Sequence, residues 1–238
     1  GFSFLEAIAT NKMSKIKVLV TGASGLVGSR FIELAKYYTF STPDLPDFDL
    51  TDEKLVKKVI EEFNPEWIVN FAAFTDVNAS EAQSGDENGS AWKVNVEGVK
   101  NLCQAFPSQK IIQISTDMVF SGDIENPGPY AENDRTSDSK DSLTWYGWTK
   151  NRAEKVILNH GGTILRIIYP VRVHFDPKTD YIRSPLKKFT AGTIYPLFND
   201  QQVCVAFGTK LPKLFKKLLT PKVQVFFTVV ATPPPLMS

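Results

Sequence analysis

The sequence predicts an α/β protein built on a doubly wound parallel sheet of the Rossmann type. Two observations carry this prediction. Short apolar, β-branched segments alternate with longer amphipathic segments between residues 16 and 168, which is the order of strands and crossover helices in a parallel sheet. A glycine-rich turn, TGASGLVG at 21–28, follows the first apolar segment and opens the first amphipathic one. Strand, glycine turn and helix in this order are typical of the first βα unit of such a fold.

Hydrophobic pattern and helix breakers place the individual elements. Strands are expected at residues 16–21, 38–42, 67–73, 110–116 and 163–168. Helices are expected at residues 25–38, 51–63, 90–105 and 144–159. Thr51 has the side chain of an N-cap, Pro65 ends the helix that Thr51 begins, and Gly161 is placed to close the last helix. Beyond residue 170 the pattern weakens, and a short basic helix at 210–222 is the one further element expected.

Three regions follow from this pattern. Residues 1–14 are expected to be an N-terminal extension and residues 15–168 the dinucleotide-binding domain. Residues 169–238 form a third region, in which the periodic pattern is weaker.

Composition narrows the functional classes. The chain has 238 residues, 42% of them hydrophobic and 22% charged, as in soluble globular proteins. Its net charge of +1 offers no broad field for nucleic acid or an anionic membrane, so neither partner is expected. Cys103 and Cys204 fit neither a disulfide framework nor a zinc site, and a cytoplasmic location without a metal is expected. His160 is expected to complement the dipole at a helix C-terminus, and His174 is expected to be exposed to solvent.

The glycine turn has a physical use. Gly22 would permit the tight turn, Gly25 would let the backbone approach a pyrophosphate, and Gly28 would let the helix pack on the strand. The alternative is a purely structural turn. Ser41 and Thr42, at the end of the second strand, are not acidic, whereas Arg30 could reach a ribose 2′-phosphate, so NADP(H) is favoured over NAD(H).

A tyrosine and a lysine lie one helical turn apart near residue 150. Tyr146 and Lys150 therefore point to one face of the expected helix. A nearby ammonium is expected to lower the pKa of the phenol, which could then exchange a proton with a carbonyl or alcohol oxygen. Thr116, at the end of the fourth strand, could polarise the same oxygen. The alternative is an exposed tyrosine beside a solvated lysine.

Six segments together resemble the extended short-chain dehydrogenase/reductase family, and they occur in the family's order. They are TGASGLVG (21–28), FDLTD (48–52), NFAAFTDV (70–77), NVEGVKNL (95–102), ISTDMVF (114–120) and YGWTK (146–150). Within the family, STDMVF, the segment 129–134 and YGWTK most resemble the dTDP-4-dehydrorhamnose reductases, although Met118 stands where those enzymes usually have an aromatic residue.

This resemblance implies roles for matching residues. Residues implied to contact the cofactor are Gly25, Leu26, Val27, Asp49, Leu50, Ala73, Phe74 and Thr75. It implies a catalytic set of Thr116, Tyr146 and Lys150, with Lys150 also bonding the nicotinamide ribose. Thr116, Asp117 and Tyr169 would contact the substrate, and Asn95 would support the central strands. For Asp117 a strand-end cap is the alternative. The resemblance also implies that residues 169–238 form a small, incomplete C-terminal substrate lobe, atypical after about residue 203.

The function that the resemblance implies is NAD(P)H-dependent reduction of a 4-keto sugar nucleotide, in the synthesis of dTDP-L-rhamnose or another polysaccharide precursor. Two alternatives stay open: a sugar-nucleotide 4-epimerase with bound NAD, and a non-catalytic regulatory subunit of the methionine adenosyltransferase type. A homodimer is an option for the assembly.

Overall fold

The computed structural model describes residues 15–124, 127–172, 174–194, 196, 206–207 and 227–228. The expected extension at 1–14, Cys204 and the basic helix expected at 210–222 lie outside the described residues. Within the described part, no helix combines the length and apolarity needed to cross a bilayer.

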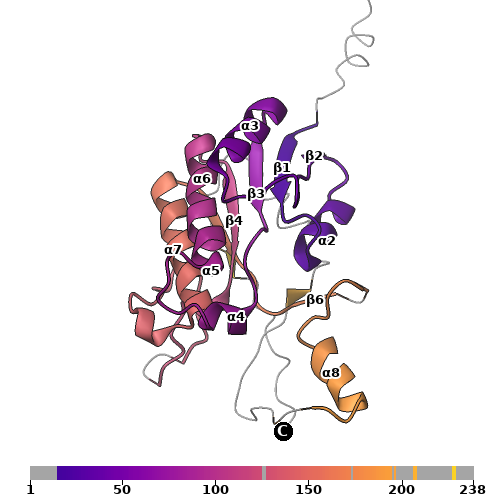
Figure 1. Ribbon diagram of the computed structural model, residues 1–238, viewed down its shortest axis with the longest axis vertical. Coiled ribbons are helices and arrows are strands. Elements are labelled where there is room, and N and C mark those ends of the chain that lie inside the picture. The colour runs from indigo at the N-terminus through magenta and orange to yellow at the C-terminus, as the bar shows by residue number, and fades with distance from the viewer. Residues whose placement is uncertain are drawn as a thin grey trace, which may run out of the picture.

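A parallel sheet forms the centre of the molecule (Figure 1). Its strand order is β2-β1-β3-β4-β5-β8, and every neighbouring pair is parallel. The strands are β1 (Lys17–Thr21), β2 (Thr39–Ser41), β3 (Trp67–Asn70), β4 (Ile111–Ser115), β5 (Thr163–Arg166) and β8 (Phe227–Thr228). A separate parallel pair joins β6 (Pro170–Val171) to β7 (Ala206–Phe207). The predicted doubly wound parallel fold is confirmed.

Helices cover both faces of the sheet. One face carries α3 (Glu53–Phe63), α6 (Gly98–Ala105) and α7 (Trp145–His160), and α2 (Leu26–Leu34) packs on the other (Figure 1). The strand side chains alternate accordingly: Val18 and Val20 of β1 join the α2 cluster, and Leu19 joins the opposite one. Each such fully buried aliphatic side chain contributes roughly 1.5–3 kcal/mol to folding.

Several boundaries differ from the expectation for local reasons. The N-cap of α3 is Asp52, whose carboxylate accepts from Leu55 N, because the Thr51 hydroxyl instead donates to Asp49. The helix expected at 90–105 is divided into α5 (Ser90–Trp92), the π-helical segment η1 (Lys93–Glu97) and α6. Gly161 closes α7 in the left-handed conformation, as predicted.

Short elements after the strands were not expected. They are α4 (Val77–Glu81), η2 (Asp117–Val119), η3 (Lys140–Ser142) and α8 (Arg183–Thr190). The first three have only three to five residues, too few side chains to show a helical period. The eight residues of α8 lie beyond residue 170, where the pattern weakens. Two of them, α4 and η2, follow the carboxyl ends of β3 and β4, the edge at which open parallel sheets bind ligands.

Candidate active site

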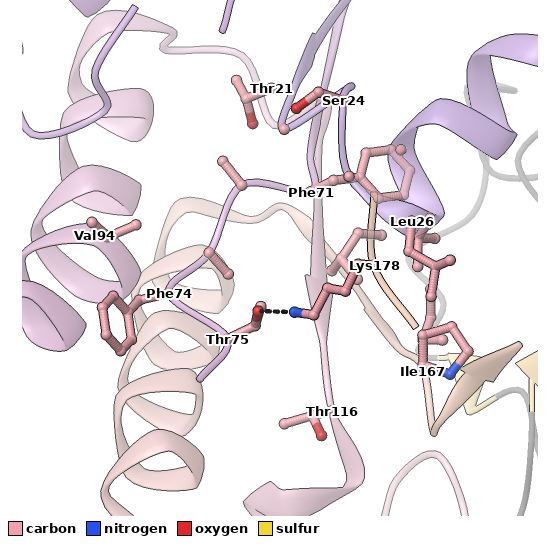
Figure 2. A pocket seen from close by; sticks show the side chains of 18 of the residues that line it. Thr21, Ser24, Leu26, Phe71, Phe74, Thr75, Val94, Thr116, Ile167 and Lys178 are labelled. Carbon is pink, nitrogen blue, oxygen red and sulfur yellow. Dashed lines mark hydrogen bonds between the residues drawn. The ribbon is translucent and has the colours of Figure 1, made fainter. Parts of the chain in front are cut away.

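A cavity of about 740 Å³ opens at the carboxyl ends of β1, β3 and β4 (Figure 2). It is hereafter the central cavity. All the residues predicted to catalyse or to bind cofactor or substrate line it, except Arg30. These lining residues are Gly22, Gly25, Leu26, Val27, Gly28, Asp49, Leu50, Ala73, Phe74, Thr75, Thr116, Asp117, Tyr146, Lys150 and Tyr169.

The glycine turn forms one end of the cavity. Gly22 has a φ of +63°, and a Cβ there would lie 2.6 Å from Ala72 N, so the turn itself needs glycine. A Cβ at Gly28 would lie 2.3 Å from Gly22 O, so close packing of α2 needs it too. Gly25 is different, because a Cβ there would lie 3.3 Å from its nearest atom, Gly22 O, a tight contact rather than an overlap. Gly25 itself lines the cavity.

The start of α2 suits an anionic group. Gly25 is the N-cap and has no capping side chain, and the first turn holds no acidic residue. Leu26 and Val27 line the cavity, and first-turn N–H groups have no partner within a helix. The buried hydroxyl of Ser115, also on the cavity wall, has no hydrogen-bond partner among the described residues. A dinucleotide, with a diphosphate and several hydroxyls, fits this donor set.

The cavity wall beyond β2 does not contain Arg30, the residue expected to contact the cofactor there. Arg30 lies outside the lining and donates to Glu33 at 2.9 Å. Asp44, three residues beyond β2, lines the cavity instead, whereas Ser41 and Thr42 do not. The Pro-Asp pair at 43–44 is the sequence signal that could have identified this acidic residue.

Buried amides support the cavity floor. Asn70 of β3 accepts from the Thr21 hydroxyl and donates to Gln113 Oε1 at 2.7 Å, which joins three strands at their carboxyl ends. Asn95, in η1, accepts from Phe74 N at 2.8 Å and donates to Thr149 Oγ1 at 2.9 Å. Asn95 thus connects the loop after β3 to α7, one residue before Lys150.

The first turn of α7 positions the tyrosine. Thr144 is the N-cap, and Glu81 of α4 accepts from Trp145 N at 2.8 Å. A Cβ at Gly147 would lie 2.2 Å from Met118 O, so only glycine lets this turn approach η2 so closely. This approach brings the Tyr146 side chain to the wall that Thr116 and Asp117 also form.

Lys150 and Thr116 are both engaged by neighbours. Lys150 is 3% exposed, and its Nζ donates to the carbonyl oxygen of Ile114 at 2.7 Å. The Thr116 hydroxyl donates to Asp117 Oδ1 at 3.0 Å and accepts from Met118 N at 3.2 Å. Thr116 is therefore also the N-cap of η2.

The predicted lowering of the Tyr146 pKa is wrong. Burial, reinforced by the charge of Asp117, raises the pKa of Tyr146 to about 12. Burial lowers the pKa of Lys150 to about 8, with Glu154 acting in the opposite direction. Burial also raises the pKa of Asp117, against the hydrogen bond from Thr116. The spacing correctly placed two groups on one face but could not account for the removal of both from water.

Sequence reasoning also missed the wall formed after β6. Residues 178–181 line the cavity, and Lys178 Nζ donates to Thr75 Oγ1 at 3.2 Å (Figure 2). Tyr169 packs against Tyr181 with ring centroids 3.9 Å apart and has a φ of 34°, which is unusual for a tyrosine. No motif covers residues 171–183.

Known proteins resemble this chain over most of its length. A family model described as the RmlD substrate binding domain matches residues 16–223. The dTDP-4-dehydrorhamnose reductase of Aggregatibacter actinomycetemcomitans is 33% identical over 147 residues, which are 60% of this chain and 47% of that protein. Methionine adenosyltransferase 2 subunit beta of Danio rerio is 34% identical over 162 residues, 63% of this chain and 47% of that protein.

A solved structure is also similar to this chain. A dTDP-4-dehydrorhamnose reductase from Clostridium acetobutylicum superposes with a TM-score of 0.73 at 27% identity, covering 86% of this chain and 70% of that one. Other solved structures of this fold hold NADP or NAD. The chain spans about half the length of the curated relatives it matches. Because the family model matches far more than half of the chain, the chain belongs to the RmlD substrate-binding domain family.

Proposed function

We propose that this protein binds a reduced nicotinamide dinucleotide over the glycine turn and reduces the carbonyl group of a 4-keto sugar nucleotide. The observation that carries the proposal is the shared cavity. Thr116, Tyr146 and Lys150 line the same cavity as the N-terminus of α2, which supports a proton donor beside a dinucleotide. The substrate by this proposal is a dTDP-4-keto sugar, as the name of the Aggregatibacter actinomycetemcomitans relative suggests.

The raised pKa of Tyr146 suits the reductive direction. A bound reduced nicotinamide would supply the hydride for the carbonyl carbon. The Tyr146 phenol, with a pKa of about 12, stays protonated at neutral pH and can give its proton to the oxygen that becomes an alkoxide. The Thr116 hydroxyl, which donates to Asp117 here, would turn its hydrogen to the same oxygen. Lys150 keeps an ammonium below pH about 8 and supports negative charge near Tyr146.

The cavity wall bears on the choice of cofactor. The prediction of NADP(H) depended on Arg30, whose guanidinium is paired with Glu33. Asp44 offers a carboxylate that can accept from a ribose 2′-hydroxyl and would repel a 2′-phosphate. We therefore favour NAD(H) over NADP(H). For the region after residue 169, the proposal is that β6, α8 and their neighbours belong to the substrate lobe.

The decisive experiment follows oxidation of NADH and NADPH in the presence of dTDP-4-dehydrorhamnose. The protein should consume the reduced cofactor, and Tyr146→Phe should lose about 10²–10⁴-fold in turnover while keeping cofactor affinity. Tyr37→Phe is the control, because Tyr37 is 44% exposed and outside the cavity. Undiminished turnover in Tyr146→Phe would refute the assignment.

A second function is favoured by one observation. The Danio rerio relative named as a methionine adenosyltransferase subunit is as similar to this chain as the reductases are. By this alternative the chain binds a dinucleotide and a catalytic partner without turnover. A stoichiometric complex with a methionine adenosyltransferase catalytic subunit, and no oxidation of NADH or NADPH with any 4-keto sugar nucleotide, would favour it.

A further inference from the structure

Residues 175–183 form a segment that follows β6 and contributes to the wall of the central cavity. Four consecutive residues of it, 178–181, line the cavity. Lys178 Nζ donates to Thr75 Oγ1 at 3.2 Å, so the segment contacts a loop more than a hundred residues earlier in the chain. Figure 2 shows the Lys178 side chain extending toward Thr75.

Interactions that do not involve Thr75 hold this segment in place. The side chain of Asp180 is fully buried and forms an ion pair with Arg183 Nε at 2.8 Å. The same carboxylate accepts from the backbone N–H groups of Ile182 at 3.1 Å and Arg183 at 2.9 Å. The Arg183 guanidinium donates in turn to the carbonyl oxygens of Phe175 and Lys178, both at 3.3 Å. The backbone of Lys178 is therefore positioned by an ion pair whose carboxylate is buried, while the Lys178 side chain is exposed.

The charges of the wall single out Lys178. The lining contains four carboxylates, Asp44, Asp49, Asp117 and Asp180, and two lysines, Lys150 and Lys178. The Lys150 ammonium is buried and donates to Ile114 O. Lys178 forms no ion pair with any carboxylate of the described chain. Because Asp180 is paired with Arg183, an anion in this cavity would meet the carboxylates of Asp44, Asp49 and Asp117. Their repulsion costs binding energy unless a cation compensates.

We propose that Lys178 is a diphosphate-binding residue of the central cavity. The ammonium would donate to a diphosphate oxygen, either in addition to Thr75 or in its place, and complement the N–H groups at the start of α2. The diphosphate has two sources under the proposed function, on which this inference rests: the dinucleotide cofactor and the sugar nucleotide. The Asp180–Arg183 pair makes Lys178 a preorganised contact, since little backbone freedom is left to lose on binding.

The test measures affinities of the full chain for NADH, for dTDP and for thymidine, which lacks phosphate. Lys178→Met keeps the stem and removes the charge, and Lys178→Arg keeps the charge. Lys187→Met is the matched control, because Lys187 is an exposed lysine of α8 outside the cavity. Equal thermal unfolding of all variants is expected and establishes that each one is folded.

Lys178→Met should weaken binding of NADH or of dTDP by about tenfold without changing the affinity for thymidine, and Lys178→Arg should keep most of the wild-type affinity. A loss of affinity confined to NADH assigns the contact to the cofactor, and a loss of affinity confined to dTDP assigns it to the sugar nucleotide. If wild type binds both probes and Lys178→Met binds both equally well, the inference fails while the proposed function stands. If wild type binds neither probe, both fail.

Discussion

Replacing Lys150 by methionine is expected to stabilise the fold at neutral pH while removing the proposed activity. Lys150 is 3% exposed, so its ammonium is almost entirely withdrawn from water. Methionine keeps a stem of similar length without the charge. A residue needed only for folding would have the opposite effect when replaced.

The magnitude follows from the pKa of the buried amine. Burial lowers it from 10.5 to about 8, which corresponds to about 3 kcal/mol at about 1.4 kcal/mol per pH unit. Methionine would recover this cost but leave the Ile114 carbonyl without the donor that lies 2.7 Å from it, a loss of about 1 kcal/mol. The net expectation is a gain of about 2 kcal/mol in the free energy of unfolding.

The sign of the pH dependence provides a second check. The lysine pKa is lower in the folded than in the unfolded state, so between pH about 8 and 10.5 the unfolded chain holds the extra proton. Wild-type stability therefore gains about 1.4 kcal/mol per pH unit in that window relative to the variant. The advantage of Lys150→Met should be full at about pH 7 and gone near pH 9.5.

Urea unfolding at these two pH values measures both quantities. Lys54→Met, an exposed lysine of α3, is the control and should change stability little at either pH. A Lys150→Met protein less stable than wild type at neutral pH, or a difference that does not change with pH, would refute the reasoning.

Three further predictions test the surroundings of the site. Arg166→Met should lower the free energy of unfolding, measured in urea, by about 3–5 kcal/mol, because it leaves the 3%-exposed carboxylate of Glu154 unpaired. Adding Glu154→Leu should recover most of this stability, and a loss below about 1 kcal/mol in Arg166→Met would contradict the role of the pair. Gly147→Ala should cost about 2 kcal/mol and slow NADH oxidation, because its Cβ would lie 2.2 Å from Met118 O; unaltered unfolding and turnover would contradict this. Asp44→Ser should improve the affinity for NADPH relative to NADH by about tenfold in a fluorescence titration. The control is Asp47→Ser, because Asp47 is exposed and outside the cavity, and equal effects of the two substitutions would argue against a role for Asp44.

The central strands could be predicted because they are buried on both faces. Such strands appear in the sequence as continuous apolar runs bounded by turn residues, as in IKVLVT before Gly22. The glycine turn was predictable for the same local reason: Gly22 and Gly28 are required by backbone contacts within one βα unit. The Tyr146–Lys150 spacing likewise predicted a shared face, since that follows from one helical turn.

Features that depend on contacts distant in sequence could not be predicted. The resemblance implied that Asn95 supports the central strands, but not which groups it contacts. Asn95 reaches Phe74 and Thr149 from a π-helical turn, which has no recognisable sequence period. Lys178 reaches the cavity because the Asp180–Arg183 ion pair orders a segment without motif or periodicity. The Tyr146 pKa has the same origin: spacing specified its neighbour, but burial, which only the assembled fold determines, controls the direction of the shift.

Two charged groups whose burial costs folding energy line the central cavity, and this supports a functional reading independently of family membership. Lys150 and Asp117 both have pKa values shifted toward the neutral form by burial. By contrast, the buried charges of Glu154 and Arg166, outside the cavity, pair with each other at 2.7 Å. Selection for stability alone would favour pairing or replacing Lys150 and Asp117 as well. Their retention in one cavity is expected when a bound ligand, rather than the protein, provides the compensating interactions.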